Sequence, residues 1–344
     1  MITVAIDEEH TRQTSAGTAR CSSALARALS ARDDVRPILL GGGPLLERGA
    51  RKKLTTARQD FIWYPWLGRH RARKLGADVY HCPTPRAPLT RGNPPLVVTV
   101  HDLVPLLFPG TMTRWSRFYG RATMTRVLDA ADLIVTPSSD TANDLTSMLG
   151  VREDRVRVVW NGVSSIFFSS PPAQQAAPVP YVLFVGTPEP RKNLPRLVEA
   201  MQVLRARGYP HTLVIAGGGG WGGVSIDSHA VRLEGRVSDE RLLSLYANAA
   251  CLALPSLHEG FGLPAVEAMA AGTPVVAGSR GALPEVVGDA GVLVDPEDVN
   301  AIASGIETAL ADRERLTRAG RARAAGFTWE KAAAAMAAIY RELV

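Results

Sequence analysis

The feature that most constrains this 344-residue chain is a pattern that occurs twice. Short runs rich in β-branched residues alternate with segments of helical length, first over residues 2–160 and again over 181–343. Between the two series, residues 164–180 show neither a helical nor a strand period and contain Pro171, Pro172 and Pro178. Alternation of this kind is typical of a parallel sheet with helices on both faces, so the pattern predicts two such sheets joined by a linker.

The expected elements set the domain limits. Strands are expected at 2–6, 35–40, 78–81, 96–100, 133–136 and 156–160, and then at 181–185, 212–216, 251–255 and 274–277. Helices are expected at 18–30 and 138–150, and then at 194–207, 238–249, 264–271, 299–313 and 329–343. Because the chain is too long for one ordinary core, we predict an α/β protein of two doubly wound, Rossmann-like domains, 1–163 and 181–328, facing a central cleft.

Composition and targeting signals narrow the class of protein. Apolar residues make up 46% of the chain and charged residues 21%, as in an ordinary soluble globular protein. No stretch reaches the ~18 uninterrupted apolar residues of a membrane span, and residues 1–6 lack a basic leader, so they are expected to form a first strand. Cys21, Cys82 and Cys251 are far apart and odd in number, which fits neither a disulfide framework nor a zinc site. We expect a cytoplasmic protein.

Two carboxylates and a glycine-rich turn form the strongest candidate site. Glu259 and Glu267 are separated by seven residues, and the turn and the start of a helix lie between them. Such a turn can present backbone amides at a helix N-terminus, where peptide dipoles hold phosphate oxygens or hydroxyls. The two carboxylates could therefore grip two parts of one elongated ligand. A capped helix with a solvated carboxylate is the structural alternative.

A second candidate follows the first strand of the second domain. The strand ends at Gly186 and Thr187, and Arg191 and Lys192 stand where the next helix begins. Two cations at the positive end of a helix dipole are unfavourable unless an anion joins them. A diphosphate would satisfy both, with Arg191 as a bidentate donor and Lys192 as a point charge. A solvated basic helix start is the alternative.

Weaker candidates lie at strand ends in the first domain. His101 directly follows the strand at 96–100 and should face the crevice, although a lone histidine there has a structural role at least as often as a catalytic one. His81 ends the preceding strand and carries less signal. Gly17 lies in the loop after the first strand, which could close on phosphates, and an ordinary connecting loop is an equal alternative.

One glycine-rich segment imitates a dinucleotide site. Residues 217–222 match G-x-G-x-x-G after a predicted strand, but five of these six residues are glycine and the match is therefore nearly unavoidable. No clear helix follows, and Trp221 lies inside the segment. NAD binding is kept only as a minor alternative.

Taken together, these segments resemble glycosyltransferase family 4 over essentially the whole chain. The segment Glu259–Glu267 looks like the E-x7-E signature of that family. The strings HDLVPLLFP and GTPEPRKNL are similar to the branch that contains bacterial O-antigen mannosyltransferases. The resemblance implies the two-domain GT-B fold and a retaining transferase that uses a nucleotide-diphosphate sugar without a metal ion or other cofactor.

The resemblance also implies a role for each candidate in the second domain. Arg191 and Lys192 would bind the donor diphosphate and neutralise the leaving group, which is why no metal is expected. Glu259 would contact the donor sugar, and Glu267 would hold the ribose hydroxyls. The other donor-binding candidates are Gly186, Thr187, Phe261, Gly262 and Leu263, the last three through their backbone amides.

In the first domain, the resemblance places His101 beside the transferred sugar and Gly17 in the loop near the phosphates. Many relatives carry two glycines in that loop, whereas this chain has Ala16-Gly17-Thr18 and so departs from the pattern. Residues 327–329 look like the point at which the chain returns to the first domain. The C-terminal helix within 329–344 is therefore expected to pack there.

The donor and acceptor follow only from the resemblance. GDP-mannose is the first expectation, with UDP- or dTDP-sugars as alternatives, and the acceptor would be a glycan, a glycolipid or a small molecule. Two other functions stay open. A nucleotide-sugar epimerase of GT-B fold would consume donor without an acceptor, and a non-catalytic protein would only bind the sugar nucleotide.

The positive charge is concentrated in the first domain. Residues 1–163 hold 23 Lys and Arg against 15 Asp and Glu, and residues 48–74 alone hold nine of these cations among several aromatic residues. A second basic run contains Arg114, Arg117, Arg121 and Arg126. Aromatic residues among cations suit peripheral contact with an anionic membrane, and core tryptophans beside solvated arginines are the alternative. No nucleic-acid-binding motif accompanies the charge, so nucleic acid is not expected as a partner.

Overall fold

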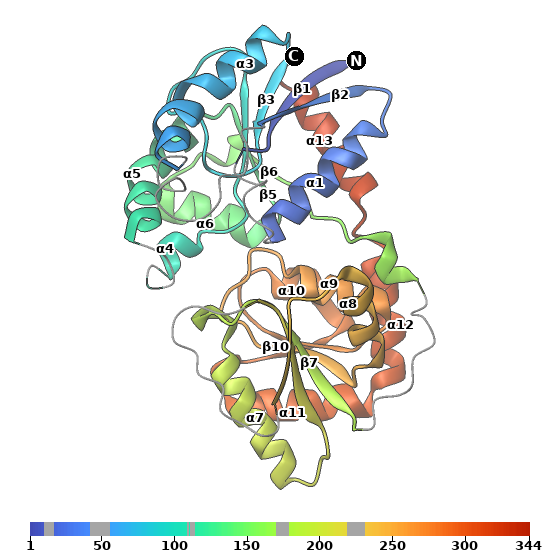
Figure 1. Ribbon diagram of the computed structural model, residues 1–344. Coiled ribbons are helices and arrows are strands. Elements are labelled where there is room, and N and C mark those ends of the chain that lie inside the picture. The colour runs from blue at the N-terminus through green and yellow to red at the C-terminus, as the bar shows by residue number, and fades with distance from the viewer. Residues whose placement is uncertain (10–16, 42–55, 109, 111–113, 170–178, 219–230) are drawn as a thin grey trace. The chain divides into compact units, whose positions relative to one another are not determined.

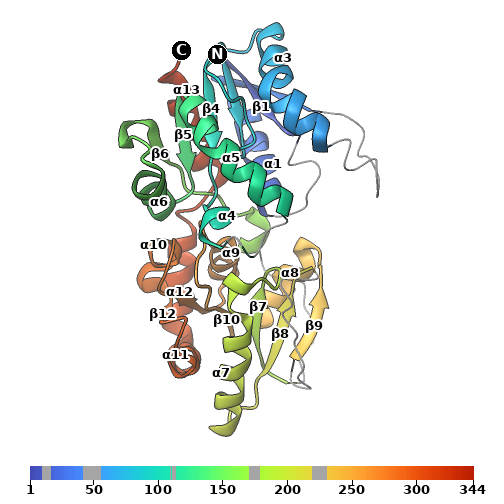
Figure 2. The same ribbon diagram turned by 90° about the vertical axis from the view of Figure 1, so that its left-hand side faces the viewer.

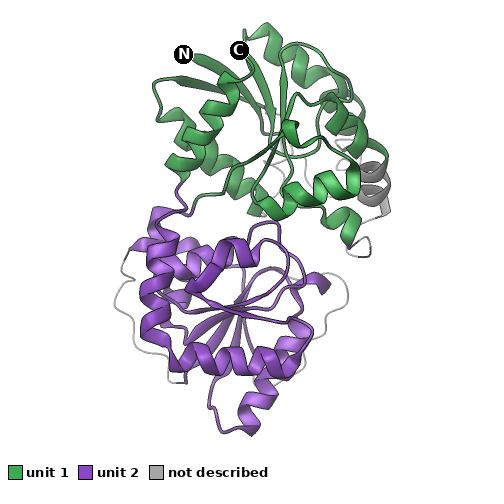
Figure 3. Cartoon of the chain, turned by 180° about the vertical axis from the view of Figure 1, so that it is seen from behind, with its two compact units in different colours: residues 1–107, 112–162, 329–344 green, residues 108–111, 163–328 purple. Residues whose placement is uncertain are grey.

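The computed structural model describes residues 1–9, 17–41, 56–108, 110, 114–169, 179–218 and 231–344. These residues form two compact units, which are coloured separately in Figure 3. Unit 1 contains residues 1–107, 112–162 and 329–344, and unit 2 contains residues 108–111 and 163–328. Among the described residues, no helix combines the length and the apolar character that crossing a membrane requires.

Unit 1 is built on a six-stranded parallel sheet with the strand order β2-β1-β3-β4-β5-β6. Its strands are β1 (Ile2–Asp7), β2 (Val35–Leu40), β3 (Val79–Cys82), β4 (Leu96–Thr99), β5 (Leu133–Thr136) and β6 (Val156–Val158). Its longer helices are α1 (Gly17–Ser30), η2 (Gln59–Leu67), α3 (Gly68–Lys74), α4 (Val104–Leu107), α5 (Arg114–Ala130), α6 (Ser139–Leu149) and α13 (Trp329–Arg341). A short 3-10 turn, η4 (Glu153–Arg155), precedes β6.

Successive side chains along the strands of unit 1 alternate between two separate hydrophobic cores. Val4 and Ile6 of β1 pack in a cluster with Leu29 of α1 and Met336 of α13. Ala5, between them, belongs to a second cluster that forms on the opposite face. Because successive strand residues point to opposite faces, these apolar runs require helices on both sides, as Figures 1 and 2 show.

The C-terminal helix α13 lies in unit 1, where it packs against α1. Arg341 near its end makes an ion pair with Asp34, and Arg157 of β6 makes one with Glu342 at 2.7 Å. The residues of α13 that share a cluster with the sheet, Ala333, Met336, Ala337, Ile339 and Tyr340, are all at most 4% exposed. This helix is therefore part of the core of unit 1.

Unit 2 repeats the architecture with a parallel sheet of order β12-β11-β10-β7-β8-β9. Its strands are β7 (Tyr181–Val185), β8 (Thr212–Ala216), β9 (Val231–Gly235), β10 (Cys251–Leu254), β11 (Val275–Gly278) and β12 (Val292–Val294). Its α-helices are α7 (Leu194–Ala206), α8 (Asp239–Asn248), α9 (Leu263–Ala271), α10 (Leu283–Val287), α11 (Val299–Ala311) and α12 (Arg313–Ala324). Short 3-10 turns are η5 (Ser165–Phe168), η6 (Pro190–Lys192) and η7 (Gly288–Ala290).

The strand order of unit 2 decides which loops meet. β7 is the first strand of the sheet, and its neighbours are β8 on one side and β10 on the other. The chain therefore reverses its direction of travel across the sheet between β7 and β10. Loops at the carboxyl ends of strands at such a switch point form the usual ligand site of an open α/β sheet.

The predicted α/β class with two doubly wound, Rossmann-like sheets is confirmed. Apart from short 3-10 turns, several elements were not predicted. They are η2 with α3, α4, α5, the edge strand β9, α10, β12, and helix α12, which follows α11 at Asp312. Within the segment predicted as an unstructured linker, residues 165–168 form η5, and the ring of Phe167 packs edge-on at 5.8 Å from Tyr246.

Candidate active site

The first part of the candidate site is the loop after β7. Gly186 ends the strand with φ of 146°, a conformation that side chains rarely adopt, and its amide donates to the carbonyl of Ala216 at 2.9 Å. A Cβ on the neighbouring Gly217 would lie 2.1 Å from the carbonyl oxygen of Gly186. Two glycines are thus required where β7 and β8 end side by side, and Thr187 continues the loop half-buried.

The loop then turns through η6, which carries Arg191 and Lys192. Asn193 follows in the left-handed region with φ of 59°, the only described non-glycine residue with positive φ. Its side-chain nitrogen Nδ2 donates to the carbonyl oxygens of Pro255 at 3.0 Å and Pro296 at 2.5 Å. Asparagine tolerates this conformation better than most residues. Asn193 therefore anchors the basic turn to the loops after β10 and β12.

The second part of the site is the loop after β10, which holds Ser256 and Glu259. β10 pairs in parallel with β7, so both loops emerge at the same edge of the sheet. The amide of Leu257 donates to the carbonyl of Arg191 at 2.7 Å, which joins the two loops directly.

Glu259 is the centre of an ion-pair cluster. Its Oε1 accepts from Lys192 Nζ at 2.5 Å and from Ser256 Oγ at 2.8 Å, and its Oε2 accepts from Arg191 at 2.9 Å. Arg191 also donates through Nε to Glu189 at 2.9 Å. The anion that the two cations were predicted to need is therefore supplied by the chain itself, through Glu259 and Glu189.

Charge inside the cluster fixes the protonation of Glu259. Burial by itself raises the pKa of this carboxyl, since only 6% of the residue is exposed. The nearby Lys192 and Arg191 outweigh burial and, with the hydrogen bonds from Lys192 and Ser256, lower the pKa to about 2. Glu259 is thus an anion at neutral pH, and three donors hold it in place.

The glycine-rich turn leads from Glu259 into α9. Gly262 is the N-cap of this helix with φ of 94°, and a Cβ there would lie 2.6 Å from Leu283 Cδ2, so glycine is needed for two reasons. Phe261 is buried and packs edge-on against Phe327 at 5.7 Å. The helix begins at Leu263, with Pro264 as its second residue, one position earlier than predicted.

Glu267 lies inside α9, 4% exposed, and accepts from the hydroxyl of Tyr246 at 3.0 Å. The structure therefore brings Gly186, Arg191, Lys192 and Glu259 together and continues through Phe261, Gly262 and Leu263 to Glu267 along one segment. All of these residues belong to unit 2.

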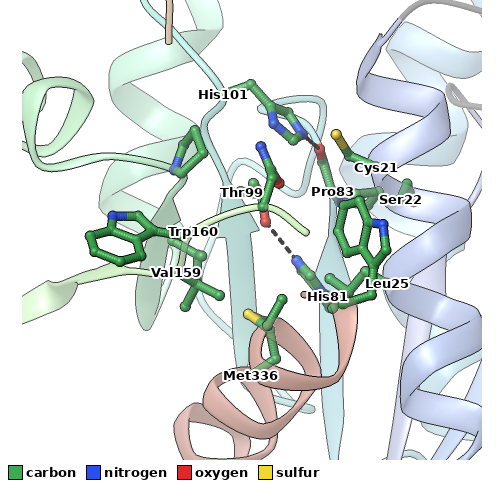
Figure 4. A pocket seen from close by; sticks show the side chains of 15 residues that line it. Cys21, Ser22, Leu25, His81, Pro83, Thr99, His101, Val159, Trp160 and Met336 are labelled. Atoms are coloured by element: carbon green, nitrogen blue, oxygen red, sulfur yellow. Dashed lines mark hydrogen bonds between the residues drawn. The ribbon is translucent and has the colours of Figure 1, made fainter. Parts of the chain in front are cut away.

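His101 belongs to unit 1, where it lines a small pocket shown in Figure 4. Its Nε2 lies 3.1 Å from the carbonyl oxygen of Pro83. A carbonyl only accepts, so Nε2 carries the proton and Nδ1 is the basic nitrogen of the neutral ring. Burial lowers the pKa of His101, although the nearby Asp102 and the Pro83 carbonyl oppose that shift. His101 is thus a neutral imidazole at physiological pH.

His81 lies deeper in the same pocket and links two elements of unit 1. Its Nδ1 lies 2.8 Å from the hydroxyl of Tyr340 on α13, and its Nε2 lies 2.8 Å from Thr99 Oγ1 at the end of β4. Burial lowers the pKa of His81 to about 3, with a further contribution from His101. This histidine has the structural role that the sequence left open.

Gly17, the remaining candidate, is the first residue of α1. The loop that precedes it, residues 10–16, lies outside the described residues, as do 219–222 of the glycine-rich segment that imitates a dinucleotide site. Two further residues of the site were not singled out from the sequence. Ser256 donates to Glu259 and Asn193 anchors the basic turn, and only the unusual position of Asn193 between a basic pair and Leu-Pro signalled it.

Comparison with known proteins identifies the family to which this chain belongs. Residues 15–165 match the family model Glycosyltransferase Family 4, and residues 169–325 match the model Glycosyl transferases group 1. An O-antigen chain mannosyltransferase B from Escherichia coli is 37% identical over 257 residues, which are 68% of this chain and 67% of the relative. The chain belongs to glycosyltransferase family 4. It is therefore a glycosyltransferase, an enzyme of hexosyl transfer, as its sequence predicted.

A second relative and a solved structure extend the comparison. An MMP α-(1→4)-mannosyltransferase from Mycolicibacterium hassiacum is 34% identical over 279 residues, 73% of this chain and 66% of the relative. The chain thus spans about two thirds of the length of these relatives. HepE from Anabaena, solved with UDP-glucose, superposes with a TM-score of 0.73 over 100% of both chains at 19% identity, which establishes the GT-B fold.

Proposed function

We propose that this family 4 enzyme transfers a hexose, mannose in the first instance, from a nucleotide-diphosphate sugar to a glycan, glycolipid or small-molecule acceptor. The observation that carries the proposal is the cluster of Arg191 and Lys192 around Glu259 at the switch point of the unit 2 sheet. The two most similar relatives described above are named as mannosyltransferases, which supports GDP-mannose as donor. Because HepE was solved with UDP-glucose, a UDP-sugar is the alternative donor.

The charges of the cluster suit a diphosphate leaving group. Arg191 and Lys192 are balanced here by Glu189 and Glu259, so the cluster is close to neutral without a ligand. A diphosphate would share these cations and gain stabilisation as negative charge develops on it. Fixed cations aimed at such charge supply several kcal/mol of transition-state stabilisation. For this reason we propose that no metal ion is needed.

Glu259 is poorly suited to attack the sugar. A carboxylate nucleophile needs an available lone pair, whereas this one accepts from Lys192, Arg191 and Ser256. Its proposed role is to hold the donor sugar and the cation pair, while Glu267 holds the ribose hydroxyls. Backbone amides of residues 261–263 and the turn at Gly186 and Thr187 complete the proposed donor site.

The proposed reaction retains the configuration at the anomeric carbon. The bond from C1 to the phosphate oxygen breaks, the acceptor oxygen forms a bond to C1 on the same face, and a phosphate oxygen takes the acceptor proton. The products are the glycoside and the nucleoside diphosphate. His101, with its proton fixed on Nε2, is proposed to lie beside the transferred sugar as a neutral hydrogen-bonding group, and Gly17 to lie near the phosphates. We propose that the enzyme acts in the cytoplasm.

Proton NMR of the reaction tests this proposal. With GDP-mannose or a UDP-sugar and an acceptor, the one-bond C1–H1 coupling of the first-formed product should report the same anomeric configuration as that of the donor, and Glu259→Ala should abolish transfer in a folded protein. Inverted product, full activity in Glu259→Ala, or a trapped glycosyl-enzyme would contradict the mechanism. Conversion of the donor without an acceptor, to an epimeric sugar nucleotide or to a free epimeric sugar, would identify an epimerase. Binding of the nucleotide without turnover of any sugar would identify a non-catalytic protein.

A further inference from the structure

The segment that joins β2 to β3 in unit 1 carries an exposed apolar face. Its described part, the π-helix η2, runs directly into α3, which is labelled in Figure 2. Phe61, Ile62 and Trp66 of η2 are 60%, 52% and 69% exposed. Trp63 and Tyr64 in the same helix are 2% and 1% exposed. The helix thus places its large side chains on two faces, one buried in unit 1 and one open.

The π-helical turn explains this separation. Hydrogen bonds run from residue i to i+5, as the bond from the amide of Gly68 to the carbonyl of Trp63 shows. Residues 61, 62 and 66 therefore share one side of the helix, and residues 59, 60, 63, 64 and 68 share the other. All five residues of the second group are buried.

Polar contacts hold the buried side of η2 against the rest of unit 1. Trp63 Nε1 donates to Asp7 at 2.8 Å, Gln59 donates to Glu9 at 3.1 Å, and Asp60 pairs with Arg86 at 2.9 Å. The exposed side chains are consequently held on a rigid support. A face that is ordered before binding avoids part of the entropy cost of docking.

Cations continue the exposed face along α3. Arg73 and Lys74 are exposed, whereas Arg71, which is also exposed, lies over the ring of Trp63 at 5.2 Å and so belongs with the other side of η2. Neither Arg73 nor Lys74 makes an ion pair with any residue that the structure describes. From residue 58 to 77 the sole acidic residue is Asp60, which is buried and paired. Residues 58–77 therefore bring apolar rings and positive charge together, and their one carboxylate is buried.

We propose that Phe61, Ile62 and Trp66, together with Arg73 and Lys74, form a lipid-docking face that binds the surface of an anionic bilayer. Isolated exposed apolar residues are common, but three on one face of one helix form a patch of the kind that marks an interaction site. Tryptophan is favoured at the depth of lipid headgroups, and each nearby Lys or Arg strengthens binding to an anionic leaflet. This inference goes beyond the proposed transfer reaction and does not depend on donor or acceptor chemistry.

Vesicle cosedimentation of the full chain tests the lipid-docking face. The probes are vesicles of phosphatidylcholine alone and of phosphatidylcholine with phosphatidylglycerol, at low and high salt. The wild-type protein should pellet with the mixed vesicles and release at high salt. Trp66→Ser should weaken binding about tenfold or more, since a large apolar side chain no longer enters the lipid. Lys74→Glu should weaken it about fivefold or more.

Matched controls lie in unit 2. Leu233 is 63% exposed and Arg205 is exposed on α7, so Leu233→Ser and Arg205→Glu repeat the two chemical changes away from the lipid-docking face. Both should bind vesicles as the wild type does. Stabilisation by a nucleoside diphosphate, measured in the same variants, shows that they are folded and reports on the donor site separately.

Three outcomes overturn the proposal. The first is a wild-type protein that does not pellet with anionic vesicles at low salt, and the second is undiminished binding by Trp66→Ser and Lys74→Glu. The third is size-exclusion evidence that Trp66→Ser converts an oligomer to a monomer while vesicle binding is unchanged, which would make a second copy the occupant. Vesicle binding without any nucleotide stabilisation would instead contradict the proposed function and leave the lipid-docking face standing.

Discussion

Two buried carboxylates, one in each unit, lie at the carboxyl ends of parallel strands where the strand order of their sheet reverses. Glu259 of unit 2 is 6% exposed and Asp7 of unit 1 is 3% exposed. Glu259 accepts from two cations and a hydroxyl. Asp7 accepts from neutral donors, namely Trp63 Nε1 at 2.8 Å, the hydroxyl of Tyr80, and the amide of Glu9 at 2.9 Å.

The two environments give the carboxyls opposite pKa shifts. Burial raises the pKa of Asp7 to about 6, and its hydrogen bonds with Tyr80, Glu9 and Trp63 only moderate that rise. Cations lower the pKa of Glu259 to about 2 in spite of similar burial. Burial alone therefore does not decide the charge of a strand-end carboxyl. Unit 2 holds a fixed anion among cations that a diphosphate can share, whereas unit 1 holds a carboxyl that titrates near neutral pH.

Removal of a cation from the Glu259 cluster should give the largest change in the free energy of unfolding and in nucleotide binding. Lys192→Met leaves Glu259 buried with one cation fewer, so we expect a loss of about 3–5 kcal/mol in the free energy of unfolding and a loss of nucleotide binding. Urea denaturation and calorimetric titration measure the two effects. Arg205→Met, on the surface of α7, should change stability by less than about 0.5 kcal/mol.

The double variant Lys192→Met/Glu259→Gln separates the two effects. It removes the stranded charge, so stability should recover in part while nucleotide binding stays lost. A Lys192→Met protein as stable as the wild type would show that the ion pair at 2.5 Å is not maintained in solution.

The decrease in the free energy of unfolding at acid pH should depend on Glu259. Its pKa falls from the ordinary 4.5 to about 2 on folding, so its contribution is complete above about pH 4.5 and is lost as pH falls through 2. The shift corresponds to about 3 kcal/mol. The stability difference between wild type and Glu259→Gln should therefore shrink towards acid pH in urea denaturation. A difference that is constant with pH would contradict the fixed-anion account.

The contribution of Asp7 to the free energy of unfolding should change with pH in the opposite direction. Its pKa rises from 3.8 to about 6 on folding, so the folded protein binds the extra proton and the contribution is present below 3.8 and lost as pH rises through 6. The expected change is about 3 kcal/mol. Relative to the wild type, Asp7→Asn should become progressively more stable as pH increases over this range. A trend of the same sign as that of Glu259→Gln would remove the contrast between the two units.

Asn193→Gly, at the anchor of the basic turn, should give the smallest change in the free energy of unfolding. Asn193→Gly keeps the left-handed conformation and loses two hydrogen bonds to carbonyls, at a cost of about 1 kcal/mol each. Asn193→Ala loses the same bonds and adds about 1–2 kcal/mol of backbone strain at φ of 59°. Urea denaturation should therefore rank alanine below glycine. Equal stability of the two variants would show that the turn relaxes out of the left-handed region.

The sequence predicted the fold where apolar runs were uninterrupted and missed elements without such a run. β9 has the sequence VRLEG and lies at the sheet edge, so it shows no buried stripe. In α12 only Leu316, Gly320 and Ala324 are buried among many charged residues. η2 contains Pro65 and follows a π-helical repeat, which is why its buried and exposed aromatic residues could not be separated by a 3.6-residue period.

The candidate site was predicted as separate segments, and their mutual contacts were not. Arg191 and Glu259 are 68 residues apart, and they meet because β7 and β10 are neighbours in the sheet although β8 and β9 lie between them in the chain. That strand order is a tertiary property. The individual roles of His101, Gly17 and the donor-binding residues of unit 2 stay predictions, as do the domain limits at 163 and 181. The side chains of Arg114, Arg117 and Arg121 lie outside the described residues, whereas Arg126 is exposed on α5.

Calorimetric titration of the wild-type protein with GDP, UDP, dTDP and NAD, each with and without EDTA, tests the central claim most directly. The charge arrangement around Glu259 predicts that one nucleoside diphosphate binds equally well with and without EDTA, that it names the base of the donor, and that Lys192→Met/Glu259→Gln does not bind it. Binding of NAD alone, binding of a nucleoside diphosphate that disappears with EDTA, or no binding at all would contradict the account.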